Sequence, residues 1–169
     1  MNDRLEIHTL GQLSIHIGDQ PVTGLTSRKA AALLVYLTAN PRAHSREVLA
    51  DMLWDERSQA RSMANLRVVL SSLRKELGEY VNITSEKVAI NPEANTWLDI
   101  IQFEQDLAPL LQPEDALSPE LFKQAEQAVS LYQGDFLEGV YLRKCRRMED
   151  WVLRERERLH HIAVAALNQ

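Results

Sequence analysis

Apolar and polar residues alternate near the N-terminus of the chain. Residues 5–17 read LEIHTLGQLSIHI, with a two-residue period on both sides of Gly11. This period is typical of strands that bury one face, so the segment predicts two strands joined by a turn. A second turn is expected between Gly18 and Pro21, because glycine and proline favour tight turns.

Helical spacing replaces the alternation after this point. Ser27 is placed to cap the helix RKAAALLVYLTAN, and Asn40-Pro41 is placed to end it. Ser45 is placed to cap a second helix, REVLADMLW. Four apolar side chains share one face of this second helix: Val48, Leu49, Met52 and Leu53.

The longest periodic stretch, residues 59–77, predicts a third helix. One apolar stripe runs along it, and Gly78 follows as the expected C′ residue; the stripe consists of Leu66, Val69, Leu70, Leu73 and Leu77. The next run, YVNITSEKVAINP, has two short β-rich segments around Ser85 and predicts a hairpin. Three helices closed by a hairpin is the order of a winged helix-turn-helix, and a leading strand pair marks one subtype.

The β signals vanish after Trp97, and the rest of the chain is predicted to be helical. Asp99 is placed to cap IIQFEQDLAPLL, and Ser118-Pro119 opens ELFKQAEQAVSLYQ with proline at the first helical position. A last amphipathic helix is expected from about 143 to 167. The predicted fold is therefore mostly α with small β: a winged helix over residues 1–92, then an all-α module over residues 97–169.

Composition excludes several classes of protein. Hydrophobic residues make up 45% of the chain and charged residues 25%, which is ordinary for a globular protein. The single cysteine, Cys145, excludes an internal disulfide and a multi-cysteine metal site. No apolar run reaches the roughly 20 residues of a membrane span, and the N-terminus does not resemble a signal peptide. We expect a cytoplasmic protein with no membrane partner.

The net charge of −5 divides unequally along the chain. Residues 1–91 carry 11 Lys and Arg against 10 Asp and Glu, whereas residues 92–169 carry 8 against 14. Residues 57–75 hold no acid and five cations: Arg57, Arg61, Arg67, Arg74 and Lys75. This basic stripe favours a polyanionic partner, although a solvated helix face has the same composition.

The face of the third helix opposite its leucines has small residues at its centre. At about 100° per residue it presents Arg61, Ala64, Val68, Ser71 and Lys75, flanked by Asn65, Arg67, Ser72 and Arg74. Small central residues let a helix approach base edges in the major groove, where Arg and Asn read guanine and adenine. The cations at the two ends of the face are expected to contact phosphates: Arg57, Arg61, Arg74 and Lys75.

Several motifs carry a family resemblance. SRKA, SREVLADMLW and ARSMANLRVVLSSLRKELG together resemble the OmpR/PhoB-type DNA-binding domain, in the branch found in the antibiotic regulatory protein (SARP) family. The second half is similar to the opening of the bacterial transcriptional activator domain, a helical, tetratricopeptide-like module, in its motifs LDIIQFE, LYQGDFLEG and WVLRERERL. The resemblance covers almost the whole chain.

The resemblance implies a role for individual residues. It implies that the third helix enters the major groove with five base-reading positions: Asn65, Arg67, Val68, Ser71 and Ser72. It also implies phosphate contacts at Arg74 and Lys75, and Lys87 in the hairpin is a further expected phosphate contact. Glu86 beside Lys87 departs from the Arg and Gly that relatives place there for the minor groove. Trp54 matches a tryptophan that closes the second helix, where core packing is its expected role.

These features predict a sequence-specific transcription regulator, an activator, that binds double-stranded DNA. RNA polymerase and a second copy on tandem half-sites are further expected partners. The alternative is a protein-interaction module whose winged helix no longer binds DNA. The helices after residue 97 leave an open apolar end, so we expect either a longer protein or self-association there.

Signals for catalysis are poor, and we expect no enzyme activity, cofactor or metal. The chain has no phosphate loop, no GxGxxG and no HExxH. Cys145 lies among four cations, which would lower the pKa of an exposed thiol, but an inert cysteine is favoured over a redox switch. His160 and His161 point apart on a helix, and we expect one at the surface and one half-buried. The core of the helical module is expected to contain Tyr132, Phe136, Tyr141 and Trp151.

Overall fold

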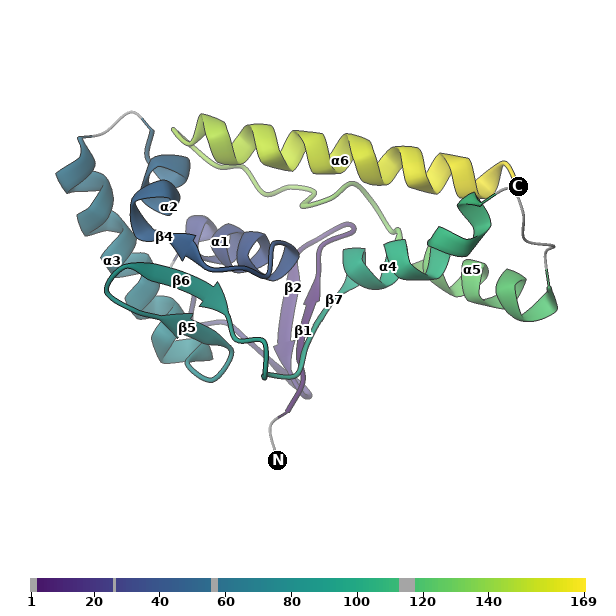
Figure 1. The fold of residues 1–169 in the computed structure, drawn as a ribbon, viewed down its shortest axis with the longest axis horizontal. Coiled ribbons are helices and arrows are strands. Elements are labelled where there is room, and N and C mark those ends of the chain that lie inside the picture. The colour runs from purple at the N-terminus through teal and green to yellow at the C-terminus, as the bar shows by residue number, and fades with distance from the viewer. Residues whose placement is uncertain (1–2, 26, 56–57, 113–117) are drawn as a thin grey trace.

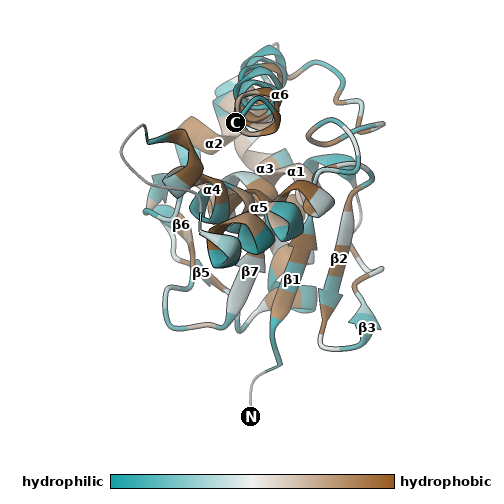
Figure 2. Ribbon diagram, turned by 90° about the vertical axis from the view of Figure 1, so that its right-hand side faces the viewer, coloured by the Kyte–Doolittle hydropathy of each residue, from teal (hydrophilic) through white to brown (hydrophobic). Residues whose placement is uncertain are grey.

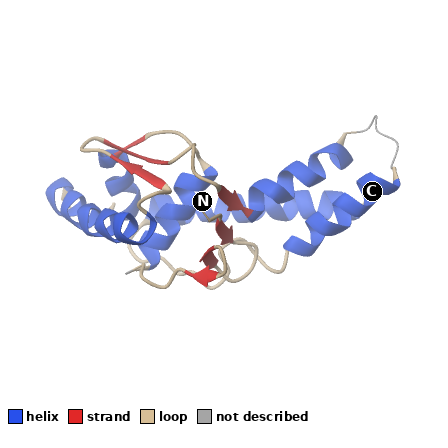
Figure 3. Ribbon diagram, turned by 90° about the horizontal axis from the view of Figure 1, so that it is seen from below, coloured by secondary structure: helices blue, strands red, loops and turns tan. Residues whose placement is uncertain are grey.

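The chain forms a helical protein with two small β-sheets, as the sequence predicts (Figure 1). The computed structural model describes residues 3–25, 27–55, 58–112 and 118–169. Seen from below, the strands near the N-terminus lie between two groups of helices, while the other strands lie over the first group (Figure 3). The first group is formed by residues 28–77 and the second by residues 99–131, while a long C-terminal helix runs past both.

The first sheet joins segments from both ends of the predicted winged helix. Its strand order is β3-β2-β1-β7, with β1 and β2 antiparallel and β7 parallel to β1. The strands are β1 (Leu5–His8), β2 (Ser14–Ile17), β3 (Gln20–Pro21) and β7 (Thr96–Leu98). The sequence predicts the first pair and the turn that follows, but it does not predict β7. The boundary between modules at 92–97 stays a prediction, and β7, which begins within that segment, completes the N-terminal sheet.

The predicted order of three helices and a hairpin is confirmed. The elements are α1 (Arg28–Ala39), β4 (His44–Ser45), α2 (Arg46–Leu53), α3 (Gln59–Leu77), β5 (Val81–Ile83) and β6 (Lys87–Ile90). The hairpin pairs β5 with β6, and β4 adds a short third strand to β6. The leucine stripe of α3 is buried as predicted, since Leu66 and Leu73 are fully covered.

The caps and helix ends predicted from the sequence are only partly confirmed. The Ser27 hydroxyl accepts a hydrogen bond from the Ala30 amide at 3.1 Å, which confirms this cap. Ser45 is the N-cap of α2, but its side chain makes no capping bond. The amide of the next residue, Arg46, donates to the Glu86 carbonyl in the hairpin. Val48 is 44% exposed, so its placement on the apolar face of α2 is wrong. Gly78 follows α3 with right-handed backbone rather than the left-handed turn of a C′ glycine.

The second half consists of helices that pack as a pair and a long third helix. They are α4 (Asp99–Leu107), the short 3₁₀ helix η1 (Ala108–Leu111), α5 (Pro119–Leu131) and α6 (Arg146–Leu167). Ser118 caps α5 through the Leu121 amide, with Pro119 at the first position as predicted. Helix α6 contacts α2 at one end and α4 further along, so it spans both halves (Figure 1). A tetratricopeptide-like arrangement stays a prediction.

Aromatic packing fixes α6 on the winged helix. The Trp151 ring meets the rings of Tyr36 and Phe136 edge-on, at centroid distances of 5.0 and 5.5 Å. At the start of α6 the Arg146 amide donates to the Asp55 carboxylate at 2.8 Å. The apolar side chains of the two halves form one buried cluster, and Figure 2 shows apolar stretches of α1, α4 and β1 together in its interior. The two halves therefore share a core.

Asp99 ties the helical half to the first sheet. Its carboxylate is 2% exposed and accepts hydrogen bonds from the Thr9 amide (2.6 Å), the Thr9 hydroxyl (2.7 Å) and the Leu10 amide (2.8 Å). The predicted capping role is thus wrong in its detail, since α4 begins at Asp99 with Leu98 as the N-cap. The side chain instead binds the turn that follows β1.

We expect Asp99→Asn to lower the free energy of unfolding by about 2–4 kcal/mol. The asparagine side chain has an NH₂ group in place of one carboxylate oxygen, and this donor would face the buried donors of Thr9 and Leu10. Urea unfolding followed by circular dichroism measures the change. Asp150→Asn, at an exposed position on α6, is the matched control and should change little. Equal stability of the two variants would contradict the structural role of Asp99.

Candidate nucleic-acid interface

The exposed face of α3 gathers most of the predicted site residues. Seven residues that the sequence predicts on this face are exposed: Arg61, Ala64, Arg67, Val68, Ser71, Arg74 and Lys75. Val68 is 65% exposed at the centre of the face, which is unusual for a branched apolar residue in a helix that buries five others. The burial of the leucine stripe orients this face, so cations, small residues and one aliphatic side chain share it.

Two of the residues predicted on α3 do not lie on the open part of that face. Asn65 is half-buried at its edge. Ser72 is only 7% exposed, and its placement on the open face is wrong. The reason is that α3 packs against α1, α2 and β5, so more than the leucine stripe is covered. Arg57 lies outside the described residues.

A hollow separates the N-terminus of α2 from the C-terminal half of α3. Its volume is about 270 Å³, and its walls are Arg46, Arg67, Leu70, Ser71 and Arg74. Arg46 reaches across to the hairpin, where its Nε donates to the Thr84 carbonyl at 2.8 Å. Arg46 is not predictable from the sequence as part of this surface, because helix packing, rather than spacing along the chain, places it beside the same hollow as Arg67 and Arg74.

The turn of the β5–β6 hairpin presents mixed charge. The Thr84 hydroxyl accepts a hydrogen bond from the Lys87 amide at 3.0 Å, which closes the turn. Glu86 and Lys87 are both exposed there. Lys87 is therefore accessible, as a phosphate contact requires, while the turn as a whole carries little net charge.

No carboxylate of the described residues neutralises the basic face of α3. The ion pairs found in the described part of the chain are Arg4–Glu6, His8–Glu6, Arg158–Glu104 and Arg158–Glu155. Pairing of the α3 cations with acidic residues of the second half would favour the alternative, a protein-interaction module that no longer binds DNA. The described residues contain no such pair. The described cations of α3 face solvent instead. The neighbouring Arg46, on α2, is bound to the hairpin.

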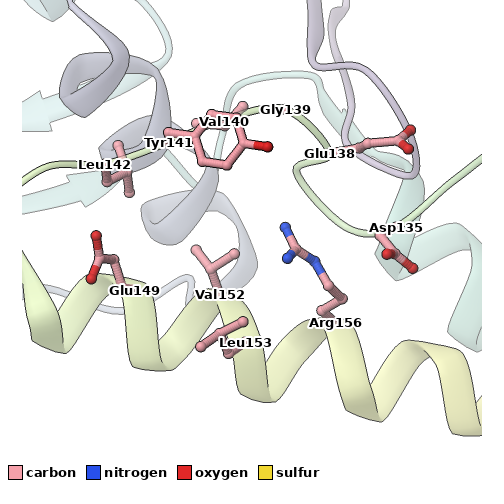
Figure 4. Close-up of a pocket in the computed structure, with 10 residues that line it drawn as sticks. All are labelled: Asp135, Glu138, Gly139, Val140, Tyr141, Leu142, Glu149, Val152, Leu153 and Arg156. Atoms are coloured by element: carbon pink, nitrogen blue, oxygen red, sulfur yellow. The ribbon is translucent and has the colours of Figure 1, made fainter.

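A second cavity lies between α6 and the segment that precedes it. Its volume is about 410 Å³, and Figure 4 shows Val152, Leu153 and Arg156 projecting from α6 toward the segment that carries Tyr141. The Arg156 guanidinium donates to the carbonyls of Phe136 and Leu137, so it supports that segment. Three exposed carboxylates line the cavity: Asp135, Glu138 and Glu149. Tyr141 is 75% exposed, which corrects its predicted place in the core, whereas Phe136 and Trp151 are buried there.

Other candidate chemistry is not assembled. The described residues contain no group of three or more His, Cys, Asp or Glu that could hold a metal ion, and no helix among them is long and apolar enough to cross a membrane. His160 and His161 are both exposed, so the expectation that one is half-buried is wrong.

Cys145 is fully buried just before α6, and burial raises the pKa of its thiol to about 11 despite the nearby Lys29. Trp54 is buried as expected, with the Lys29 ammonium 4.8 Å from its ring.

Comparison with known proteins shows the fold. No family model matches the chain, and no curated protein matches it. A solved structure of Mycobacterium tuberculosis EmbR, in complex with a low-affinity phosphopeptide, is similar to the chain with a TM-score of 0.67 and 21% sequence identity. The match covers 95% of this chain and 44% of the EmbR chain. The chain therefore shares its fold with a part of EmbR and spans less than half of the length of that protein.

We expect the Cys145 thiol of the folded protein to resist modification. With a pKa of about 11, only about one thiol in a thousand is ionised at pH 8, and burial also blocks access of the reagent. Reaction with Ellman's reagent at pH 8 should be slow in buffer and fast in 8 M urea, where the reference pKa is restored. A thiol that reacts equally fast in both would support the redox switch instead.

Proposed function

We propose that this protein is a sequence-specific transcription regulator of the SARP type, an activator, which inserts α3 into the major groove of double-stranded DNA. The observation that carries the proposal is the exposed basic face of α3, which has small residues at its centre and no carboxylate partner among the described residues. Desolvating such a face against protein would be costly, whereas phosphates compensate its charge.

The face divides into a reading centre and cationic ends. Ala64, Val68 and Ser71 occupy the centre, where a close approach to base edges allows a thymine methyl or a hydroxyl contact. Arg61 and Lys75 lie toward opposite ends of the helix and Lys87 in the hairpin, and we assign all three to phosphates. Half-buried Asn65 reaches bases only from the edge of the face, through its amide.

Two further observations support the regulator assignment. The fold shared with EmbR extends over 95% of this chain, so it includes the helical half as well as the winged helix. The motifs of the sequence resemble the same two-part organisation of SARP regulators. A cytoplasmic location and the absence of enzyme activity follow from this assignment, and they are part of the proposal.

The acidic half positions the winged helix and recruits partners in this account. Its net charge repels phosphate, and Trp151 and Asp55 hold α6 against the helices of the winged domain. RNA polymerase and a second copy on a tandem half-site are the partners we assign to it. The second candidate function, a protein-interaction module without DNA, is favoured by one feature: Tyr141 and Leu153 are exposed beside the acid-lined cavity.

Selection of bound sequences from a random duplex pool tests the proposal directly. The full chain should enrich a motif, and its affinity for that motif should fall steeply as salt is raised, since phosphate contacts release counterions. A pool that shows no enrichment and no binding even at 50 mM salt would leave the protein-interaction module as the better reading.

Two matched variants of α3 should have different effects. Val68→Ala should cost roughly 1–3 kcal/mol on the selected motif and little on random DNA, because it removes a contact to a base. Lys75→Gln should weaken both duplexes alike and reduce the salt slope by about one unit, because it removes a phosphate contact. Fluorescence-anisotropy titrations on the two duplexes measure both effects. Identical behaviour of the variants would contradict the division of the face.

A further inference from the structure

The geometry points to an anion site in the hollow between α2 and α3, which binds one phosphate group of the DNA backbone through Arg46, Arg67 and Arg74. The inference rests on the proposed function for the source of the phosphate, but the hollow itself is independent of it. It also changes the role of Arg67, which the sequence places among the base-reading residues.

Three arginines from two helices line this hollow. Arg46 comes from the first turn of α2, whereas Arg67 and Arg74 lie two turns apart on the same side of α3. Buried Leu70 and exposed Ser71 complete the walls of the 270 Å³ space. Guanidinium groups present planar forks of N–H donors that match phosphate oxygens in pairs. The Ser71 hydroxyl is a further donor at the same place.

Like charges gathered in this way need a counter-charge. None of the three arginines forms an ion pair with a carboxylate in the described part of the chain. Glu47 on α2 and Glu86 in the hairpin turn are close in sequence to Arg46 or to its hairpin contact, yet both are exposed and neither pairs with it. A bound phosphate would compensate the positive charge of the three arginines that line the hollow.

The hollow is held in shape before any ligand binds. Arg46 is half-buried, and its bond to the Thr84 carbonyl fixes the side chain between α2 and the hairpin. Its amide donates to the Glu86 carbonyl, which fixes the backbone at the same point. A donor that is already positioned loses less conformational entropy when it binds. Arg46 is therefore the rigid member of the site, and the two α3 arginines are the exposed ones.

The position of the hollow separates backbone contacts from base contacts. At about 100° per residue, Arg67 and Arg74 lie on the α2 side of α3, between the leucine stripe and the outward centre. Ala64 and Val68 point outward, away from that side. A phosphate in the hollow thus fixes the depth and register of α3, while the central residues meet the base edges.

The first experiment uses inorganic phosphate and the full chain. In ¹H–¹⁵N spectra of the arginine Nε–Hε groups, the signals of Arg46, Arg67 and Arg74 should shift together with one dissociation constant. Arg154, exposed on α6, is the control and should not follow them. Arg46→Lys keeps the charge but loses the fork, and it should weaken the binding of phosphate. Uniform small shifts of all arginines would overturn the anion site, whatever the protein does with DNA.

The second experiment asks whether DNA supplies the phosphate. The duplex is a selected one in which single phosphates are replaced by neutral methylphosphonates. One replacement should weaken binding of the unmodified protein about tenfold and weaken binding of Arg67→Ala and Arg74→Ala by less, because each variant has already lost one of the three arginine contacts to that phosphate. Arg154→Ala should respond like the unmodified protein. These α3 variants leave the Arg46 bond to the hairpin intact, so misfolding does not confuse the result.

The outcomes distinguish the anion site itself from the claim that the DNA backbone supplies its phosphate. Coupling of one phosphate position to both α3 arginines, together with the concerted shifts, supports the site. Equal losses in all proteins at every replaced position would overturn the backbone phosphate as its ligand, even where inorganic phosphate binds. If no duplex binds at all, the proposed function fails, and concerted shifts with inorganic phosphate would then show an anion site that serves another ligand.

Discussion

Burial of the leucine stripe of α3 is the constraint from which the rest of the candidate interface follows. A helix of 19 residues that covers Leu66, Val69, Leu70, Leu73 and Leu77 can present only the opposite side to solvent. The packing of α1 and α2 against that stripe also carries Arg46 to the flank of α3. The same apolar contacts therefore orient the reading centre and bring the three arginines of the hollow together.

Many of the elements that form the candidate interface could be predicted from the sequence, because the patterns that specify them lie within short stretches of the chain. The period of α3, the Ser27 and Ser118 caps and the hairpin turn each depend on residues a few positions apart. Ser72 was placed wrongly because one apolar stripe does not reveal that a second flank is also covered. β7 is only three residues long, and its parallel pairing with β1 spans about 90 positions. Arg46 and exposed Tyr141 likewise depend on tertiary packing that no period encodes.

The shared core gives the acidic half a defined position. Trp151 packs between a ring of the winged helix and a ring of the segment before α6, and the amide at the start of α6 is bound by Asp55, which follows α2. Asp99 adds a buried polar link to the turn after β1. The negative charge of the acidic half repels phosphate, which agrees with the proposed placement of DNA on the α3 face.

Backbone-amide chemical shifts during titration with a selected DNA duplex test this account most directly. The account predicts that the largest changes fall on residues 61–75 and on the hairpin turn at 84–87, with the cavity-lining residues 135–156 unaffected. Changes centred on 135–156, or no change at any residue at low salt, would contradict the assignment of the α3 face as a DNA interface.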